Sequence, residues 1–153
     1  MSGPLVIGLG ALDRGDDAVG AAVAAAVARR LSGVTVVVHE DPTGLLDVWA
    51  GRSPVVIVDA IRSGAAPGAV HRFEIGGGEP GAWARSAYGG THAIGLAEVV
   101  DLARALGRLP GRLVVVGVEA ERFDHGAPLS EAVAAAVPTA AARVCEELGH
   151  VPR

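Results

Sequence analysis

Several acidic side chains and one histidine occupy positions from which they could bind a metal ion together. They follow three predicted strands or open a predicted helix: Asp16-Asp17, Asp41, Asp59 and His92. In an open α/β sheet the carboxyl ends of parallel strands line one crevice, where ligands bind. Two carboxylates and a neutral imidazole leave coordination positions open for water or substrate. This set of oxygen and nitrogen donors suits nickel, zinc or manganese.

Each of these side chains also has a purely structural interpretation. One acid at a helix N-terminus stabilises the helix by about 1 kcal/mol, so a pair at Asp16-Asp17 facing the crevice favours a functional role. Asp41 and Asp59 fit turns that close a strand. A histidine at a helix start is usually a surface residue, although the helix dipole favours the neutral imidazole that binds metals. Glu119, after the fifth predicted strand, is expected to be solvated.

The first glycine-rich loop, residues 8–17, permits a different interpretation. It carries two glycines of a dinucleotide-binding fingerprint, and Glu40 or Asp41 supplies the acid expected to bind a ribose. Asp13 stands where the third glycine should be, however. Two more acids occupy the helix N-terminus that should receive the pyrophosphate, and their charge opposes its binding. A nucleotide-binding α/β module therefore remains the alternative.

Short apolar, β-branched runs alternate with helical patterns along the chain, which is typical of a parallel sheet covered on both faces. The predicted strands are Leu5–Gly8, Val34–His39, Val55–Asp59, Val70–Ile75 and Leu113–Val118. The predicted helices run from Asp16 or Asp17 to Leu31 and over Gly44–Ala50, Ile94–Leu106 and Glu131–Leu148.

Three further features complete the fold prediction. The fourth strand, Val70–Ile75, alternates more loosely than the others and is expected at a sheet edge, antiparallel to the rest. Residues 76–91 are glycine-rich, contain Trp83 and Tyr88, and are predicted to form a long loop. Ser130 is expected to cap the last helix. The sequence therefore predicts one domain over residues 1–153, a three-layer α/β/α sandwich with a mostly parallel twisted sheet of about five strands.

Composition argues against several classes of protein. The chain of 153 residues has a formal net charge of -4, which argues against a nucleic-acid partner. All 13 basic residues are arginine, which excludes a phosphate-binding or Schiff-base lysine. The one cysteine, Cys145, forms neither an internal disulfide nor a thiolate metal cage and is expected to be buried. No apolar run approaches the ~20 residues that cross a bilayer, and no signal-peptide pattern begins the chain, so we expect a cytoplasmic protein.

Over nearly its whole length the sequence also resembles the hydrogenase maturation proteases. Their opening signature is similar to Gly8-x-Gly10 followed by Asp16-Asp17-x-x-Gly20. Further similar segments follow in the family's order: Asp41 with a glycine-containing turn, IVDA at Ile57–Ala60, Pro67-Gly68, THAIGL at Thr91–Leu96, VVVGVE at Val114–Glu119 and LSEAV at Leu129–Val133.

The resemblance implies an aspartic-type endopeptidase that removes the C-terminal extension of a [NiFe]-hydrogenase large-subunit precursor after nickel insertion. It also implies an α/β/α sandwich around a twisted five-stranded sheet, in agreement with the pattern of elements. The family's metal-contacting acid, acid and histidine correspond to Asp17, Asp59 and His92, and the nickel is expected to arrive with the substrate. Asp17 is expected at the catalytic centre, with Asp41 as the candidate general base. We expect the precursor to be the partner and the protein to be a monomer.

Position 11 departs from the family pattern. The family usually has an asparagine after the second glycine of the loop, and Ala11 stands there in this chain. Alanine offers no side-chain hydrogen bond, so any role of that amide in orienting an acid or the scissile carbonyl is lost. This departure keeps open a non-catalytic chaperone or adaptor that recognises the nickel centre without cutting.

Overall fold

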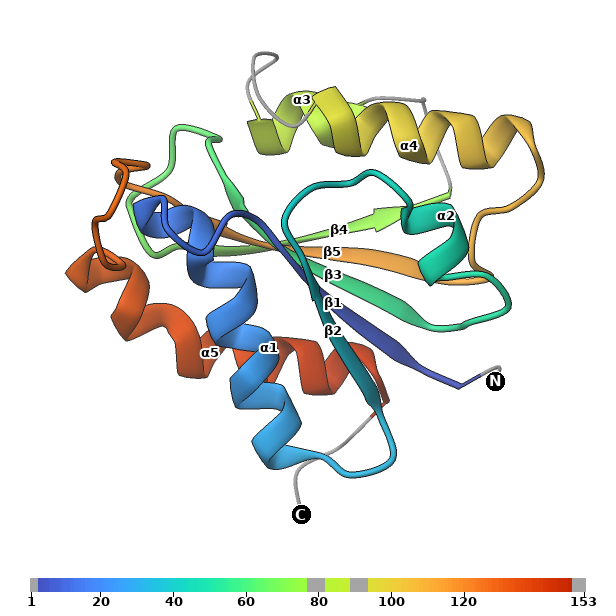
Figure 1. Ribbon diagram of the computed structural model, residues 1–153, viewed down its shortest axis with the longest axis horizontal. Helices are drawn as coiled ribbons and strands as arrows, with labels where there is room; N and C mark the ends of the chain where they lie inside the picture. The colour runs from blue at the N-terminus through green and yellow to red at the C-terminus, as the bar shows by residue number, and fades with distance from the viewer. Residues whose placement is uncertain (1–2, 77–81, 89–93, 150–153) are drawn as a thin grey trace.

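One mixed sheet of five strands forms the middle layer of the protein, in the order β2-β1-β3-β5-β4 (Figure 1). The structure, a computed structural model, describes residues 3–76, 82–88 and 94–149. Neighbouring strands are parallel except at one edge, where β4 runs antiparallel to β5. The strands are β1 Leu5–Leu9, β2 Thr35–His39, β3 Val55–Ile61, β4 Val70–Ile75 and β5 Leu113–Glu119. The predicted sheet and its antiparallel edge strand are confirmed.

Helices cover both faces of this sheet, which makes the three layers of an α/β/α sandwich (Figure 1). The helices α1 (Val19–Arg30) and α5 (Glu131–Glu147) pack on one face, and a short 3-10 helix, η1 (Gly15–Ala18), leads into α1. On the other face lie α2 (Leu45–Val48), α3 (Ala82–Tyr88) and α4 (Ile94–Ala105).

The central strand β3 shows why the sequence forms this double-sided core. Successive side chains of a strand point to opposite faces. Val56 and Val58 pack with the residues of α1 and α5, whereas Val55 and Ile57 pack with those of α2 and α4. All four are fully buried, which explains the unbroken apolar run. The same alternation places Asp59 on the α3–α4 face, at the carboxyl end of the strand.

Two glycines let α1 approach the sheet closely. A Cβ atom on Gly20 would lie 2.5 Å from the carbonyl oxygen of Leu9 and 2.6 Å from that of Val58. A Cβ atom on Gly8 would lie 2.4 Å from the carbonyl oxygen of Gly20. Because backbone atoms stand on both sides, a larger residue cannot be accommodated by a side-chain rotation. This contact brings the start of α1 against the ends of β1 and β3.

Some predicted elements differ from the structure. Residues Ala82–Tyr88 form α3 inside the segment predicted as a loop, because packing of its aromatic residues outweighs the flanking glycines. The strand β2 lies at a sheet edge and Val38 is 45% exposed, although its β-branched run resembles that of a fully buried strand. The strand β3 continues two residues past Asp59, so this acid lies within the sheet.

Two expectations from composition concern burial and membrane spans. Cys145 is buried in α5, as predicted. Within the described part of the chain, no helix has the length and apolar character needed to cross a membrane.

Candidate functional site

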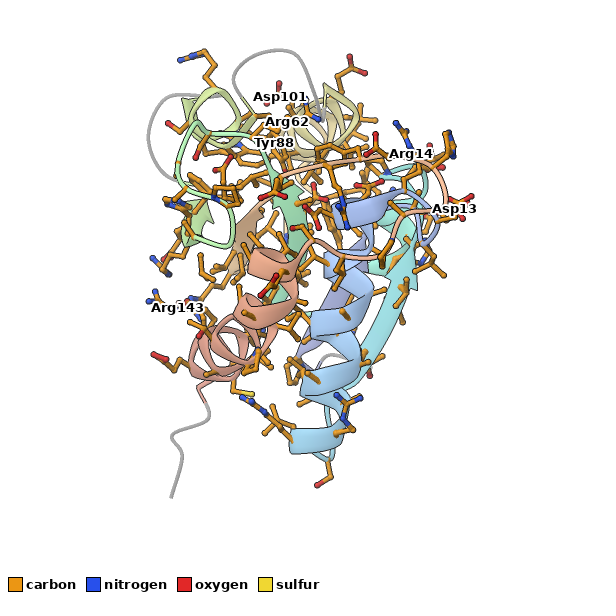
Figure 2. The ribbon with its side chains drawn as sticks, turned by 90° about the vertical axis from the view of Figure 1, so that its left-hand side faces the viewer. Asp13, Arg14, Arg62, Tyr88, Asp101 and Arg143 are labelled. Carbon is orange, nitrogen blue, oxygen red and sulfur yellow. The ribbon has the colours of Figure 1, made fainter. Side chains whose placement is uncertain are left out.

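A cavity of about 240 Å³ opens at the carboxyl ends of β1, β2 and β3. Figure 2 faces this end of the sheet. The strand β2 lies on one side of β1 and β3 lies on the other, so the order of the strands reverses at β1. The cavity therefore lies at a topological switch point of the sheet, where ligands bind in such folds. The lining residues are Leu9, Gly10, Arg14, Asp17, Glu40, Asp41, Pro42, Asp59, Ala60, Arg62, Tyr88, Leu96 and Phe123.

Asp59 is the most buried acid of the cavity, with 6% of its surface exposed. Its Oδ1 accepts a hydrogen bond from the backbone N–H of Ala60 at 2.9 Å, and its Oδ2 accepts one from the Tyr88 hydroxyl at 2.7 Å. Burial raises the pKa of Asp59 to about 7, against the Tyr88 hydrogen bond, which lowers it. The charge of Asp17 also contributes to this raised value, by less than burial does. The charges of the two carboxylates that line this cavity therefore interact unfavourably.

Tyr88, the partner of Asp59, was not among the predicted site residues. It is buried at the end of α3, and Trp83 packs edge-on against it with ring centroids 6.1 Å apart. The backbone N–H of Arg62 donates to the carbonyl of Ala87 at 2.8 Å, which fixes the end of α3 beside β3. Two aromatic residues in a chain with 3% aromatics were the available signal. Their glycine-rich surroundings pointed to a loop instead.

Replacing Tyr88 by phenylalanine is expected to raise the pKa of Asp59 further above its value of about 7. The hydroxyl donates to the ionised carboxylate, and such bonds contribute about 1.5–3 kcal/mol, so we expect the pKa to rise by roughly 1–2. An NMR titration of the Asp59 carboxyl carbon measures the change. Trp83→Phe, which keeps the hydroxyl in place, is the control. An unchanged or lowered pKa in Tyr88→Phe would contradict this account of the hydrogen bond.

Asp17, in η1, is half-buried and lines the same cavity. Its Oδ2 accepts a hydrogen bond from the backbone N–H of Ala11 at 2.8 Å. Gly10 makes this approach possible: it has φ +130, and a Cβ atom there would lie 2.1 Å from the carbonyl oxygen of Asp17. The amide that orients this acid therefore belongs to the backbone. Alanine at position 11 keeps it, whatever a longer side chain there would add.

Asp16 does not face the cavity, contrary to the expectation for the adjacent acids. It is fully buried, and its carboxylate accepts four hydrogen bonds from the loop between β5 and α5. The donors are the backbone N–H groups of Glu121 (2.7 Å), Arg122 (3.0 Å) and Ser130 (2.6 Å) and the Ser130 hydroxyl (2.9 Å). Burial would raise the pKa of Asp16, but these bonds together lower it. The short helix η1 turns the two neighbouring carboxylates in different directions.

Two other predicted roles change for related reasons. Ser130 is the N-cap residue of α5, as predicted, but its side chain makes no capping hydrogen bond and instead donates to Asp16. Glu119 is 3% exposed, so the prediction of a solvated side chain was wrong. Its Oε1 accepts hydrogen bonds from the Ser63 hydroxyl at 2.5 Å and from the Ser63 backbone N–H at 3.1 Å. Through these hydrogen bonds, Ser130 and Glu119 each hold a loop in place at the carboxyl end of the sheet.

The remaining predicted ligands are Asp41 and His92. Asp41 lines the cavity and is exposed. The backbone N–H of Thr43 donates to its Oδ1 at 2.8 Å, and this bond lowers the pKa of Asp41. His92 lies outside the described residues. Within 3–76, 82–88 and 94–149, no group of three or more His, Cys, Asp or Glu side chains is placed to hold a metal ion.

Two arginines of the cavity were also missing from the predicted site. Arg14 precedes η1 and Arg62 follows β3, and both side chains line the cavity and are exposed. In Figure 2, Arg62 lies beside Tyr88, and Arg14 lies across from them at the start of η1. The sequence offered no spacing or periodicity that would single out these two among 13 basic residues.

The arrangement of Asp17 and Asp59 favours a bound cation. Two carboxylates that repel each other in one partly enclosed cavity are stabilised by sharing a proton or by a positive ion between them. Each carboxylate is held by a backbone N–H, so both approach a ligand in a fixed orientation. The two side chains could therefore supply oxygen ligands to a cation that enters the cavity.

Comparisons with known proteins agree with the fold and identify related proteins. Residues 41–147 match the family described as hydrogenase maturation protease (HycI). The chain is similar to the solved structure of the hydrogenase maturating endopeptidase HybD from E. coli, with 28% sequence identity and a TM-score of 0.80 over 97% of this chain and 93% of the other. It is also similar to the [NiFe] hydrogenase maturation protease HybD from Thermococcus kodakarensis, with 27% identity and a TM-score of 0.76 over 97% and 99% of the two chains. No curated protein sequence matches it.

Proposed function

Because the chain belongs to the hydrogenase maturation protease family, we propose that it is an endopeptidase that removes the C-terminal extension of a [NiFe]-hydrogenase large-subunit precursor after nickel insertion. The similar E. coli protein is a hydrogenase maturating endopeptidase, and the similar Thermococcus protein is a [NiFe] hydrogenase maturation protease. The observation that carries the proposal is the pairing of Asp17 and Asp59 in one cavity at the switch point of the sheet.

In this proposal the nickel of the precursor is the recognition feature. Asp17 and Asp59 supply carboxylate oxygens to it, and His92, predicted as the third ligand, supplies an imidazole nitrogen. Carboxylate and imidazole donors suit nickel. Binding a metal that is already held by the substrate fixes the neighbouring peptide bond in the cavity. Positioning of this kind can lower a reaction barrier by several kcal/mol.

Water then attacks the fixed peptide bond. The substrate's nickel can polarise the reacting groups as a Lewis acid, and a carboxylate can accept the proton of the water. Asp41 is the candidate for the second role because it lines the cavity and is ionised at neutral pH. Its lowered pKa makes it a weak proton acceptor, so this mechanism depends more on the metal than on the base. Because aspartates supply two of the proposed nickel ligands and the candidate proton acceptor, we classify the peptidase as aspartic-type.

Replacing Asp17 by alanine is expected to reduce cleavage of nickel-loaded precursor at least about 100-fold, because one of the oriented ligands disappears. Mass spectrometry of the precursor before and after incubation measures the loss of the extension. Asp13→Ala is the matched control: Asp13 lies in the same loop, is exposed and does not line the cavity. It should cleave at the wild-type rate.

The same assay separates the rival functions. Binding of intact precursor by the wild-type protein, with no change in the precursor's mass, would identify a nickel-centre adaptor instead of a protease. Full activity of Asp17→Ala would remove the proposed recognition of nickel. A nucleotide-binding module is disfavoured because Asp17 occupies the entrance to α1 that a pyrophosphate would need.

A further inference from the structure

The guanidinium groups of Arg14 and Arg62 add positive charge to a cavity that otherwise presents carboxylates. In the described residues, neither group takes part in an ion pair, whereas Arg72, Arg108 and Arg112 all do. Asp17 and Asp59 line the same cavity, yet neither pairs with an arginine there. Among residues 3–76, 82–88 and 94–149, both cations therefore have no acidic partner and are available to a ligand.

The loop between β5 and α5 holds both arginines. The guanidinium carbon of Arg62 lies 4.3 Å from the ring centroid of Phe123, a cation–π contact that orients the group. Arg14 forms an isolated antiparallel bridge with His125, two residues further along. Two backbone N–H groups of this loop donate hydrogen bonds to Asp16, and these bonds hold the loop in place. The two side chains thus start from anchored positions on either side of the cavity.

A guanidinium group presents its N–H donors in a planar fork that matches a carboxylate. The cavity of about 240 Å³ is smaller than the ~300–1,000 Å³ typical of small-molecule sites. A ligand that contacts both the aspartates and the arginines must therefore carry its metal and its anionic group close together.

We infer that Arg14 and Arg62 form a subsite for a carboxylate of the precursor peptide, beside the segment whose nickel meets Asp17 and Asp59. The inference rests on the proposed function and adds a specificity determinant to it. The carboxylate comes either from an acidic side chain near the scissile bond or from the end of the C-terminal extension. In both cases the arginines bind the peptide and act on KM, while the aspartates govern the chemical step.

Steady-state cleavage of nickel-loaded precursor by Arg14→Ala, Arg62→Ala and Arg62→Lys tests the subsite. We expect each alanine variant to raise KM about five- to tenfold with kcat little changed, and the lysine variant to recover part of the loss. The increase should shrink at high salt, because exposed charges are screened. Arg29→Ala, an exposed arginine at the far end of α1, is the control and should leave KM unchanged.

Altered precursors identify the carboxylate. One set carries single Glu→Gln or Asp→Asn changes around the cleavage junction, and another ends in a C-terminal amide. One of these changes should raise KM for the wild-type protein. It should leave KM for Arg62→Ala unchanged, because that variant has already lost the pair between Arg62 and the precursor carboxylate. The inference is wrong if KM stays within twofold of the wild-type value for both alanine variants. It is also wrong if the Arg62→Ala substitution raises KM for every neutralised precursor as much as it does for the unaltered one.

A binding experiment keeps this inference separate from the proposed function. A synthetic peptide spanning the junction, as the free acid and with all its carboxylates amidated, is titrated calorimetrically into wild type and Arg62→Ala. Tighter binding of the free acid that disappears in Arg62→Ala supports the subsite even if no precursor is cut, and the proposed function alone then fails. Cleavage of precursor together with equal binding of both peptides overturns the subsite alone.

Discussion

Asp59→Asn is expected to abolish cleavage and, at pH 8, to make the protein more stable than the wild type. The carboxylate is nearly enclosed, with 6% of its surface exposed, and its pKa is raised to about 7 by burial. An amide of the same shape has one acceptor oxygen, which can keep the bond from the Ala60 N–H, and its NH2 group can donate to the Tyr88 hydroxyl. It has no charge to bury and is a poor metal ligand. Loss of function together with a gain in stability is typical of residues kept for activity.

The stability effect depends on pH in a defined direction. Asp59 ionises in the unfolded chain near its ordinary pKa of 3.8 but in the folded protein only near 7. Between these values the folded state binds the additional proton, so the stability of the wild type falls as pH rises through this window. Above about pH 7 the loss is complete, and a shift of about three units corresponds to at most about 4 kcal/mol.

Thermal unfolding at pH 5 and pH 8 measures this difference. A net gain of about 1–3 kcal/mol at pH 8 corresponds to a Tm higher by roughly 2–10 °C for a domain of this size, and the gain should shrink at pH 5. Asp101→Asn, an exposed aspartate of α4, controls for the loss of one negative charge. A Tm gain that is equal at the two pH values, or a lower Tm at pH 8, would contradict the burial of an ionisable Asp59.

Asp16→Ala is expected to lower the free energy of unfolding by about 3 kcal/mol or more. Its carboxylate accepts bonds from three backbone N–H groups and the Ser130 hydroxyl. Each buried donor that loses its partner costs about 1–3 kcal/mol. Because the pKa of Asp16 is lowered, its contribution is present above the ordinary pKa of 3.8 and is lost as pH falls below it, opposite to the effect of Asp59.

Urea unfolding at pH 7 of Asp16→Ala beside Asp17→Ala tests this assignment. Asp17 accepts one hydrogen bond and is only half-buried, so its alanine variant should lose about 1 kcal/mol. The two variants should therefore differ: Asp16→Ala should mainly lower stability, whereas Asp17→Ala should mainly reduce cleavage. Equal losses of stability in the two variants would contradict the different orientations of these two side chains.

The sequence predicted the sheet because its signals are local. Unbroken β-branched runs such as residues 55–58 identify buried parallel strands, and chain order then places Asp17, Asp41 and Asp59 at one end of the sheet. The directions of side chains could not be predicted in the same way. Asp16 and Asp17 have identical chemistry and adjacent positions, and only the short helix η1, fastened to the loop after β5, decides which of them faces the cavity.

The parts of the site that were missed depend on long-range packing. Tyr88 reaches Asp59 because α3 folds against the end of β3, and no pattern within a glycine-rich segment indicates that contact. Glu119 was predicted to be solvated because it follows a strand. Its carboxylate instead accepts hydrogen bonds from Ser63, which lies 56 positions earlier in the chain. Arg14 and Arg62 line the cavity beside a loop that is remote in sequence: the Arg62 guanidinium packs on Phe123, and the backbone of Arg14 forms a bridge with His125.

In the proposed function, Asp17 and Asp59 coordinate a nickel ion that the substrate brings with it. The most direct measurement compares cleavage of nickel-loaded and nickel-free precursor by the purified wild-type protein, with mass spectrometry of the product. The account predicts removal of the extension from the nickel-loaded precursor and no detectable removal from the nickel-free one. Equal cleavage of the two precursors would contradict it.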